Sequence, residues 1–354
     1  MTAVAVQNRP CASGGRMVFA DSARGFMILL MLVGHTDPPK LLFKLIYGFH
    51  MPFFFLLSGY LFDAEKYARM RFGTYCKMRF VSYMIPYFFY AFCNLLLNIP
   101  LEIRQGITGK TLAFSTAKHV LWILYAVGDK TRLPNCTPLW FLPCLFVCCL
   151  LFYGLRRMPK QPPQWAACVL FCGAAFLLSE MRAPQLPWHI DTALLGTVYM
   201  QIGFAARTLQ FPQRPPYALP AALGLAAVGF FCIVRNGLID LNNLALQNIA
   251  LTLVGSVCVC AAVFLVFYRL RHGRFLVWIG RNTIPVFAFN YAVNAYLRLI
   301  WSCVFPNSSL PWWLLAILDV PCLVGVVLLR NAAHKKRQSV RRSSAEKPAA
   351  AEKQ

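Results

Sequence analysis

The sequence predicts an all-α integral membrane protein with about ten transmembrane helices and both termini in the cytoplasm. Of its 354 residues, 58% are hydrophobic and only 13% are charged, whereas soluble domains have about 45–50% apolar and about 25% charged residues. The mean hydropathy is +0.55. This composition excludes a water-soluble enzyme, a disordered chain and a secreted disulfide scaffold, because most of the chain must be buried in lipid.

Ten segments are apolar over the length of about 20 residues that a helix needs to cross a bilayer. These predicted spans are 17–36, 41–62, 80–100, 138–155, 164–180, 189–209, 216–235, 246–268, 275–298 and 310–330. An eleventh apolar segment, 112–127, contains Lys118 and His119. We expect this segment to be half-inserted or to form an amphipathic helix at the membrane surface.

The distribution of charge predicts the orientation of the chain. The sequence contains 35 Lys and Arg residues against 12 Asp and Glu residues, a net charge of +23. In a membrane protein this excess is typical of cytoplasmic loops, so we expect no nucleic-acid partner. The cations gather in the loops after even-numbered spans and in the tail, at Lys66, Arg69, Arg71, Lys77, Arg79, Arg156, Arg157, Lys160, Arg207, Arg214, Arg269, Arg271, Arg274, Arg330, Lys335, Lys336, Arg337, Arg341, Arg342, Lys347 and Lys353.

Hydropathy and charge together divide the chain into three parts. Residues 1–16 are predicted to be an N-terminal cytoplasmic segment, and residues 17–330 a multi-pass membrane domain. Residues 331–354 are basic and rich in Ser, Ala, Lys and Glu, so this C-terminal tail is predicted to be disordered. No soluble domain is expected at either end.

Ionisable side chains inside predicted spans are costly in lipid and indicate function. The first span, 17–36, contains Asp21, Arg24 and His35. Arg24 and His35 are eleven residues apart, so they project from one face of a helix, about 16 Å apart along its axis. Asp21 and Arg24 are spaced i, i+3 and can form an ion pair. This face either lines a polar cavity or consists of a buried ion pair with a histidine at the outer interface.

The second span, 41–62, contains a further histidine and a proline near its start. His50 lies two residues before Pro52, which is expected to break or kink the helix. Ser58 and Tyr60 supply two hydroxyl groups on either side of a glycine that permits a close backbone approach.

A series of short motifs extends over residues 18–330. In chain order they are Asp21-Ser22-Ala23-Arg24-Gly25 with Gly34-His35, Phe49-His50-Met51-Pro52 with Ser58-Gly59-Tyr60-Leu61, Lys77 and Arg79 before Ile85-Pro86-Tyr87, Leu139-Trp140-Phe141-Leu142, Pro187-Trp188 with Asp191-Thr192-Ala193, and Ile279-Gly280-Arg281-Asn282-Thr283. This series resembles the membrane acyltransferase-3 family, and it is nearest to stand-alone sugar O-acetylases of the fucose 4-O-acetylase type. Two positions depart from the family pattern: Ser82 replaces a second arginine, and Asn290 replaces a common histidine.

The resemblance implies an integral membrane enzyme that transfers an acyl group, usually acetyl from acetyl-CoA, to a hydroxyl group of a carbohydrate. Acceptors in such families are mostly cell-envelope or exported glycans. The implied location is a cell membrane, as a multi-pass protein of the bacterial inner membrane.

O-acylation requires a base that takes the hydroxyl proton and groups that hold the donor. We expect His35 to be the base, because an imidazole has a pKa near working pH. Arg24, which stays protonated, is expected to hold a donor phosphate or to orient the reacting group. His50 is the second candidate for the base. Lys77 and Arg79 are expected to bind the phosphates of the donor, although topology alone also accounts for their charge.

Six residues are predicted to bind the substrate, namely Asp21, Ser58, Tyr60, Trp140, Asp191 and Asn290. Trp140 can stack on a sugar ring or belong to an aromatic belt at the membrane interface. His189 and Asp191 have no partners at metal-ligand spacing, so no metal cofactor is expected. Three other histidines are expected to be solvated or interfacial: His119, His272 and His334. Asp319, inside the last span, has no role assigned by the sequence.

The alternative function is a transporter or exporter of a saccharide or a lipid-linked precursor. Transporters typically contain internal repeats with paired broken helices. The two halves of this sequence show no such self-similarity, and the intramembrane charges concentrate in the first two spans. An O-acyltransferase is therefore the favoured prediction.

The charge distribution gives a testable orientation. A reporter fused after Gln354 and a reporter inserted within residues 101–135 should respond on opposite sides of the membrane, because an odd number of predicted spans separates them. Alkaline phosphatase and green fluorescent protein fusions in intact cells measure this directly. Two reporters on the same side would show that the predicted number of spans between them is wrong by an odd number.

Overall fold

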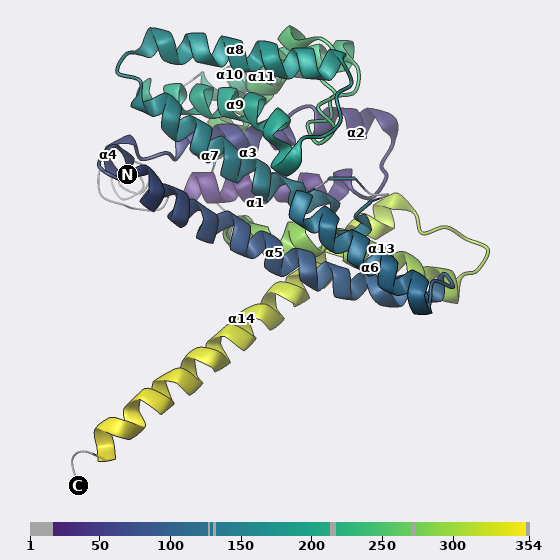
Figure 1. Ribbon diagram of the computed structural model, residues 1–354. Coiled ribbons are helices and arrows are strands. Elements are labelled where there is room, and N and C mark those ends of the chain that lie inside the picture. Colours follow the sequence, from purple (N-terminus) through teal and green to yellow (C-terminus); the bar gives the residue numbers. More distant parts are fainter. Residues whose placement is uncertain (1–16, 127, 130–131, 213–216, 271–272, 352–354) are drawn as a thin grey trace.

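The computed structural model describes residues 17–126, 128–129, 132–212, 217–270 and 273–351 (Figure 1). The described residues form α-helices and short 3-10 turns and contain no β-strand, apart from one isolated bridge between Asp240 and Ala245. The prediction of an all-helical protein is confirmed. Residues 1–16, which were assigned to an N-terminal segment, and His272 lie outside the described residues.

One helix, α1 (Val18–Gly34), lies at the centre of the bundle. It is buried along most of its length because its neighbours surround it. These neighbours are α2 (Lys40–Tyr47), α3 (His50–Tyr60), α11 (Ile249–Arg269), α12 (Arg274–Arg281), α13 (Thr283–Val304) and α14 (Trp312–Ala351).

The remaining helices extend the bundle on two sides. One side consists of the paired helices α5 and α6, and the other side contains α8, α9, α10 and α11 (Figure 1). These elements, with the short helices between them, are α4 (Ala64–Ala68), α5 (Phe72–Arg104), α6 (Gly109–Tyr125), η1 (Pro134–Trp140), α7 (Phe141–Arg157), α8 (Gln161–Glu180), η2 (Pro187–His189), α9 (Ile190–Thr208) and α10 (Ala218–Asn236).

Seven helices in the described part of the chain are long and apolar enough to cross a membrane. They cover Lys40–Tyr60, Phe72–Arg104, Asn135–Arg157, Gln161–Glu180, Ala218–Asn236, Ile249–Arg269 and Trp312–Ala333. The other three predicted spans contain α1, α9 and α13. Helix α1 has only 17 residues, and α9 and α13 carry buried polar side chains. Each of these three helices carries polar side chains that are buried inside the protein.

Two predicted spans are interrupted. The second breaks at Gly48 and Phe49 into α2 and α3, and Pro52 then lies in the first turn of α3, where a helix needs no internal N–H donor. The expected break near Pro52 is therefore confirmed. The ninth span divides at Asn282 into α12 and α13.

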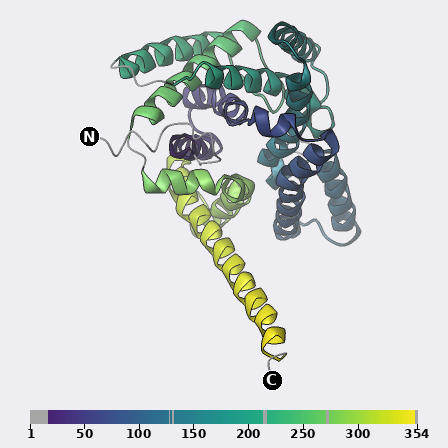
Figure 2. The ribbon, with the colours of Figure 1, turned by 90° about the vertical axis from the view of Figure 1, so that its left-hand side faces the viewer.

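The last helix is longer than its predicted span. We expected disorder after residue 330, whereas α14 continues to Ala351 and projects away from the bundle (Figures 1 and 2). The extension is rich in Ala, Lys and Arg, which have high helix propensity. A helix that already exists in the preceding turns also avoids the cost of nucleation.

The uncertain segment 112–127 forms α6, which packs along α5. The Tyr87 hydroxyl of α5 donates a hydrogen bond of 2.7 Å to the Ile123 carbonyl oxygen. His119 is buried, with Nδ1 3.5 Å from Glu102 Oε1, so of the two expectations for this residue, solvated or interfacial, the solvated one is wrong. A carboxylate that is buried at the end of α5 requires such partners, and α6 supplies them.

Helices α1 and α12 cross at two glycines. A Cβ atom added to Gly25 would lie 2.0 Å from the Leu276 carbonyl oxygen, and one added to Gly280 would lie 1.8 Å from the Asp21 carbonyl oxygen. Both distances are far below van der Waals contact, so only glycine permits this approach. The crossing brings the motif that begins at Asp21 into contact with the motif around Gly280.

Alanine at this crossing should destabilise the fold. We expect Gly280→Ala to lower the free energy of unfolding by about 1–3 kcal/mol or more, because the new methyl group overlaps backbone that cannot move aside. The matched control is Gly173→Ala in α8, where no atom lies within 4 Å of the added Cβ. Melting temperatures of the detergent-purified proteins and their levels in membranes measure both effects. Equal stability of the two variants would contradict the close crossing.

Candidate functional site

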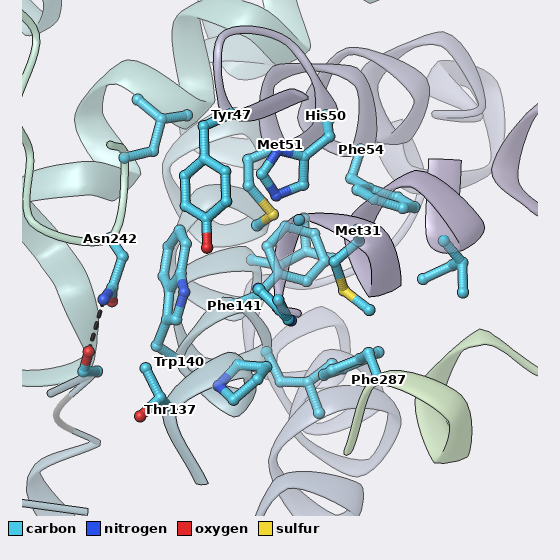
Figure 3. A pocket seen from close by; sticks show the side chains of 18 of the residues that line it. Met31, Tyr47, His50, Met51, Phe54, Thr137, Trp140, Phe141, Asn242 and Phe287 are labelled. Atoms are coloured by element: carbon cyan, nitrogen blue, oxygen red, sulfur yellow. Dashed lines mark hydrogen bonds between the residues drawn. The ribbon is translucent and has the colours of Figure 1, made fainter. Parts of the chain in front are cut away.

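A cavity of about 620 Å³ lies beside α1 and extends along the face that carries Arg24 and His35. Its walls come from α1, α2, α3, α5, η1, α7 and α13, and from the loops around Asp129 and Asp240. Figure 3 shows Tyr47, His50 and Trp140, which belong to three different elements, among the side chains that line this space. Of the two alternatives for the first span, the structure therefore supports the polar cavity.

His35 lies at the C-terminal end of α1 and is held by α13. Its ring Nδ1 is 2.7 Å from Asn290 Oδ1, and the Asn294 amide donates a 3.4 Å hydrogen bond to the His35 carbonyl oxygen. The Tyr291 ring packs edge-on, with its centroid 4.9 Å from that of the imidazole. One face of α13 thus fixes both the backbone and the ring of His35.

A second hydrogen bond orients Asn290. Its Nδ2 donates to Asp319 Oδ2 of α14 over 2.7 Å, and both side chains are completely buried. Because the amide nitrogen points to a carboxylate, the amide oxygen faces His35 and accepts the Nδ1 proton. The basic lone pair of the imidazole is then on Nε2. Asp319, which had no role in the sequence analysis, completes a chain of hydrogen bonds from α14 to α1.

His50 lies in the first turn of α3 and also lines the cavity. Its Nδ1 donates to the Ile46 carbonyl oxygen over 2.9 Å. The Tyr47 ring lies between the two histidines, with its centroid 4.9 Å from that of His50 and 6.2 Å from that of His35. Both candidates for the base therefore face the same cavity. The two imidazoles differ in the group that orients them. A backbone carbonyl orients His50, whereas the side chain of Asn290, itself held by a carboxylate, orients His35.

The opposite end of the cavity is basic. Arg24 lines it, and the Arg24 guanidinium lies 3.4 Å from Asp21 Oδ1. Arg281 Nε donates to the other oxygen of Asp21 over 3.1 Å. The predicted ion pair between Asp21 and Arg24 is present, and Asp21 holds arginines instead of lining the cavity. Among the cations that were predicted to bind the donor, Arg24 lines the cavity and is able to contact an anionic donor there.

Aromatic and amide groups surround the end of the cavity near His35. Trp140, Tyr47 and Tyr291 supply ring faces, and Thr137 and Asn242 supply polar groups. Asn242 Nδ2 donates to the Gly128 carbonyl oxygen over 2.5 Å, the bond drawn in Figure 3. Rings with a few placed polar groups are typical of small-molecule sites. The sequence analysis missed Tyr47, Tyr291 and Asn242, because no local pattern distinguishes them from packing residues.

The two cations expected to bind the donor are not brought together. Lys77 and Arg79 lie on different faces of α5, and Lys77 is exposed. The Arg79 guanidinium lies over the rings of Tyr67 and Tyr75, 4.9 Å and 5.0 Å from their centroids. Neither cation lines the cavity. Residues two positions apart on a helix are rotated by about 200° around its axis. Lys77 and Arg79 therefore point away from each other and could not share one site.

Two predicted substrate-binding residues of α3 are placed differently from one another. Ser58 lines the cavity, and its hydroxyl donates to the Phe54 carbonyl oxygen within α3. Tyr60 does not line the cavity, and its ring packs against Phe19 and Phe264. The intervening glycine is in close contact with α9, as the sequence indicated, since a Cβ there would be 1.9 Å from a backbone oxygen.

Asp191 is also outside the cavity. It is buried in the first turn of α9, and its Oδ2 accepts a 3.5 Å hydrogen bond from the Leu186 backbone N–H. A carboxylate at this position interacts favourably with the N-terminal end of the helix dipole. Its predicted role in acceptor binding is not supported by this placement. Trp140, by contrast, lines the cavity and packs against His189, with ring centroids 4.9 Å apart.

The fold and the cavity define a class of protein: a helical membrane protein with a basic group and an oriented imidazole in one internal cavity. A sequence model of the acyltransferase domain Acyl_transf_3 matches residues 17–330. The chain belongs to this acyltransferase-3 family and is an O-acyltransferase.

Two curated relatives are nodulation proteins. The chain is 24% identical to nodulation protein NolL of Mesorhizobium japonicum over 357 residues, which cover 92% of this chain and 89% of the relative. It is 32% identical to nodulation protein NolL of Sinorhizobium fredii over 171 residues, 44% of this chain and 46% of that protein. No solved structure matches the chain.

The hydrogen-bond chain behind His35 predicts a graded effect on activity. Asp319→Ala should lower kcat about ten- to hundredfold, because Asn290 loses the partner that fixes its amide and with it the ring of His35. Asp319→Asn keeps an acceptor oxygen and should retain more activity than the alanine variant. The KM for the acyl donor should stay unchanged in both. A loss of protein from the membrane without a loss of specific activity would show that Asp319 only stabilises the fold.

Proposed function

We propose that this membrane acyltransferase transfers an acetyl group from acetyl-CoA to a hydroxyl group of a cell-envelope or exported carbohydrate. The observation that carries the proposal is the cavity of about 620 Å³, which has Arg24 toward one end and the oriented imidazole of His35 toward the other. A spacing of eleven residues on α1 separates the two groups by about 16 Å along the helix. One cavity therefore offers separate places for an anionic donor and a neutral acceptor.

The chemistry follows from the tautomer of His35. Nε2 accepts the proton of the acceptor hydroxyl as its oxygen attacks the carbonyl carbon of the thioester. The carbon–sulfur bond breaks, and the thiolate leaves as coenzyme A after it takes the proton back from the imidazolium. The Asn290 oxygen that accepts from Nδ1 also stabilises the imidazolium, because both ring nitrogens are donors in that state. These reaction steps require no metal.

The proposed orientation places the donor and the acceptor on opposite sides of the membrane. Ten spans with both termini in the cytoplasm put the N-terminal end of α1, with Arg24, on the cytoplasmic side, where acetyl-CoA is present. The His35 end then faces the loops that contain Asp129 and Asp240, on the outer side. The proposed location is the inner membrane of a bacterium, with the bilayer itself as the partner of the exposed apolar helices.

The lining near His35 supports a carbohydrate acceptor. Trp140, Tyr47 and Tyr291 offer flat apolar faces, and amide and hydroxyl groups at Asn242 and Thr137 lie at the same end. A sugar has apolar C–H faces and a rim of hydroxyl groups, which match such a combination of rings and hydrogen-bonding side chains. An acceptor that binds there brings a hydroxyl group toward His35.

Histidine variants test the function and the identity of the base together. Envelope and exported glycans from cells that express the protein should carry an acetyl-sized mass that is absent from cells without the gene. His35→Ala should abolish this mass while the protein accumulates normally, because removal of a general base costs a factor of about 10²–10⁴ in rate. Mass spectrometry of the glycans and immunoblots of membranes measure the two properties.

The matched comparison is His50→Ala, which removes the other imidazole of the cavity. This variant should retain more transfer activity than His35→Ala. If His50→Ala abolishes transfer and His35→Ala does not, the base is His50. If expression of the unaltered protein never changes the mass of any glycan, the carbohydrate acceptor is wrong.

A further inference from the structure

The carboxylate of Asp21 holds two arginines from different helices. Arg24 of α1 lies 3.4 Å from Oδ1, and Arg281 of α12 lies 3.1 Å from Oδ2. The Asp21 side chain is only 4% exposed, whereas the side chains of Arg24 and Arg281 are 25% and 44% exposed. The anion is thus enclosed, and the two cations remain accessible on either side of it.

The close crossing of α1 and α12 fixes this arrangement. Gly280 precedes Arg281, and its Cα lies directly against the backbone of Asp21. Since the neighbouring backbones touch, Arg281 reaches Asp21 through Nε alone. Its side chain is 44% exposed, and the hydrogen bond to Asp21 leaves its two terminal nitrogens as further donors. A planar guanidinium bound in this way presents a fixed edge of N–H donors to a ligand.

The charges near the crossing do not balance. Two guanidinium groups against one carboxylate leave these three side chains with a net charge of +1. The sequence between Asp240 and Asp319 contains no acidic residue, so α12 and α13 add none. Carboxylates that orient cations in this manner keep the guanidinium planes in place for an anion, and arginine binds phosphate oxygens in pairs.

We propose that Arg281 and Arg24 together form the binding site for the phosphate groups of the acyl donor, with Asp21 as the residue that positions both. This inference rests on the proposed function, because it takes the donor to be a coenzyme A thioester. The anionic part of the donor lies at Arg281, at the surface of the protein, and its pantetheine arm extends past Arg24 into the cavity toward His35. Arg79, enclosed by tyrosine rings, is outside this site.

Binding of coenzyme A to the purified full-length protein in nanodiscs tests the site. Isothermal titration calorimetry should show that Arg281→Gln weakens binding about ten- to hundredfold, the loss expected for a charge-assisted contact to phosphate. Arg281→Lys should lose part of this affinity, since the charge stays and the planar fork is removed. The matched control is Arg274→Gln, an exposed arginine at the start of the same helix, which should bind as the unaltered protein does.

Two further measurements separate binding from structure. Dephospho-coenzyme A lacks the 3′-phosphate and keeps the diphosphate. If it binds with equal affinity to the unaltered protein and to Arg281→Gln, Arg281 contacts the 3′-phosphate. In the transfer assay, Arg281→Gln should raise the KM for acetyl-CoA and leave kcat nearly unchanged, whereas a distorted fold would lower kcat and the melting temperature.

Three outcomes would overturn the site. Equal affinity of Arg281→Gln and Arg274→Gln for coenzyme A would remove Arg281 from it. Weakened binding in Arg79→Gln with normal binding in Arg281→Gln would place the phosphates at the tyrosine-enclosed arginine. A lowered melting temperature without a change in affinity would make Arg281 a structural partner of Asp21. Failure of the unaltered protein to bind coenzyme A would instead reject the donor, and with it the proposed function.

Discussion

Polar side chains on a helix inside a bilayer have no water to satisfy them, so their partners must come from the protein. Helix α1 carries an aspartate, an arginine and a histidine within one span, and this requirement determines its place in the bundle. Asp21 is paired with arginines at one end, and His35 is held by α13 at the other. A helix with these groups cannot face lipid, which explains why it lies at the centre, surrounded by other helices.

The same requirement shapes the neighbours of α1. Helices α12 and α13 are separated by a break at Asn282, so each approaches α1 at its own angle and supplies a different polar group. Glycines at the α1–α12 crossing bring the backbones into contact, which places Arg281 beside Asp21. At the other end, Asn290 contacts His35 with its amide oxygen, and its amide nitrogen donates to Asp319 of α14. Helices α12, α13 and α14, which are remote from α1 in the sequence, thus supply the partners of the polar side chains of α1.

The hydrogen-bond chain from Asp319 to His35 has a direct consequence for acyl transfer. A buried hydrogen bond is strong and directional because the surrounding medium is of low dielectric constant. In the proposed mechanism, the fixed tautomer gives the imidazole a basic nitrogen, and Asn290 also stabilises the imidazolium that forms. The resemblance to the acyltransferase-3 family implies a histidine at position 290. An amide accepts the Nδ1 proton without titrating itself, so Asn290 is still able to orient the ring of His35.

The sequence by itself determined the class of the protein and the polar face of its first span. Hydropathy, the spacing of Arg24 and His35, the break at Pro52 and the family motifs are all local patterns, so they can be predicted without a fold. Only the tertiary structure decided which distant residues meet this face. It joined His35 to Asn290, 255 residues further along the chain, and Asn290 to Asp319, another 29 residues on. It also placed Arg281 on Asp21 and left Lys77, Arg79 and Asp191 outside the cavity. The reason is physical: hydropathy sets which segments enter the membrane, whereas the angles at which helices cross depend on side-chain packing between segments that no local pattern relates.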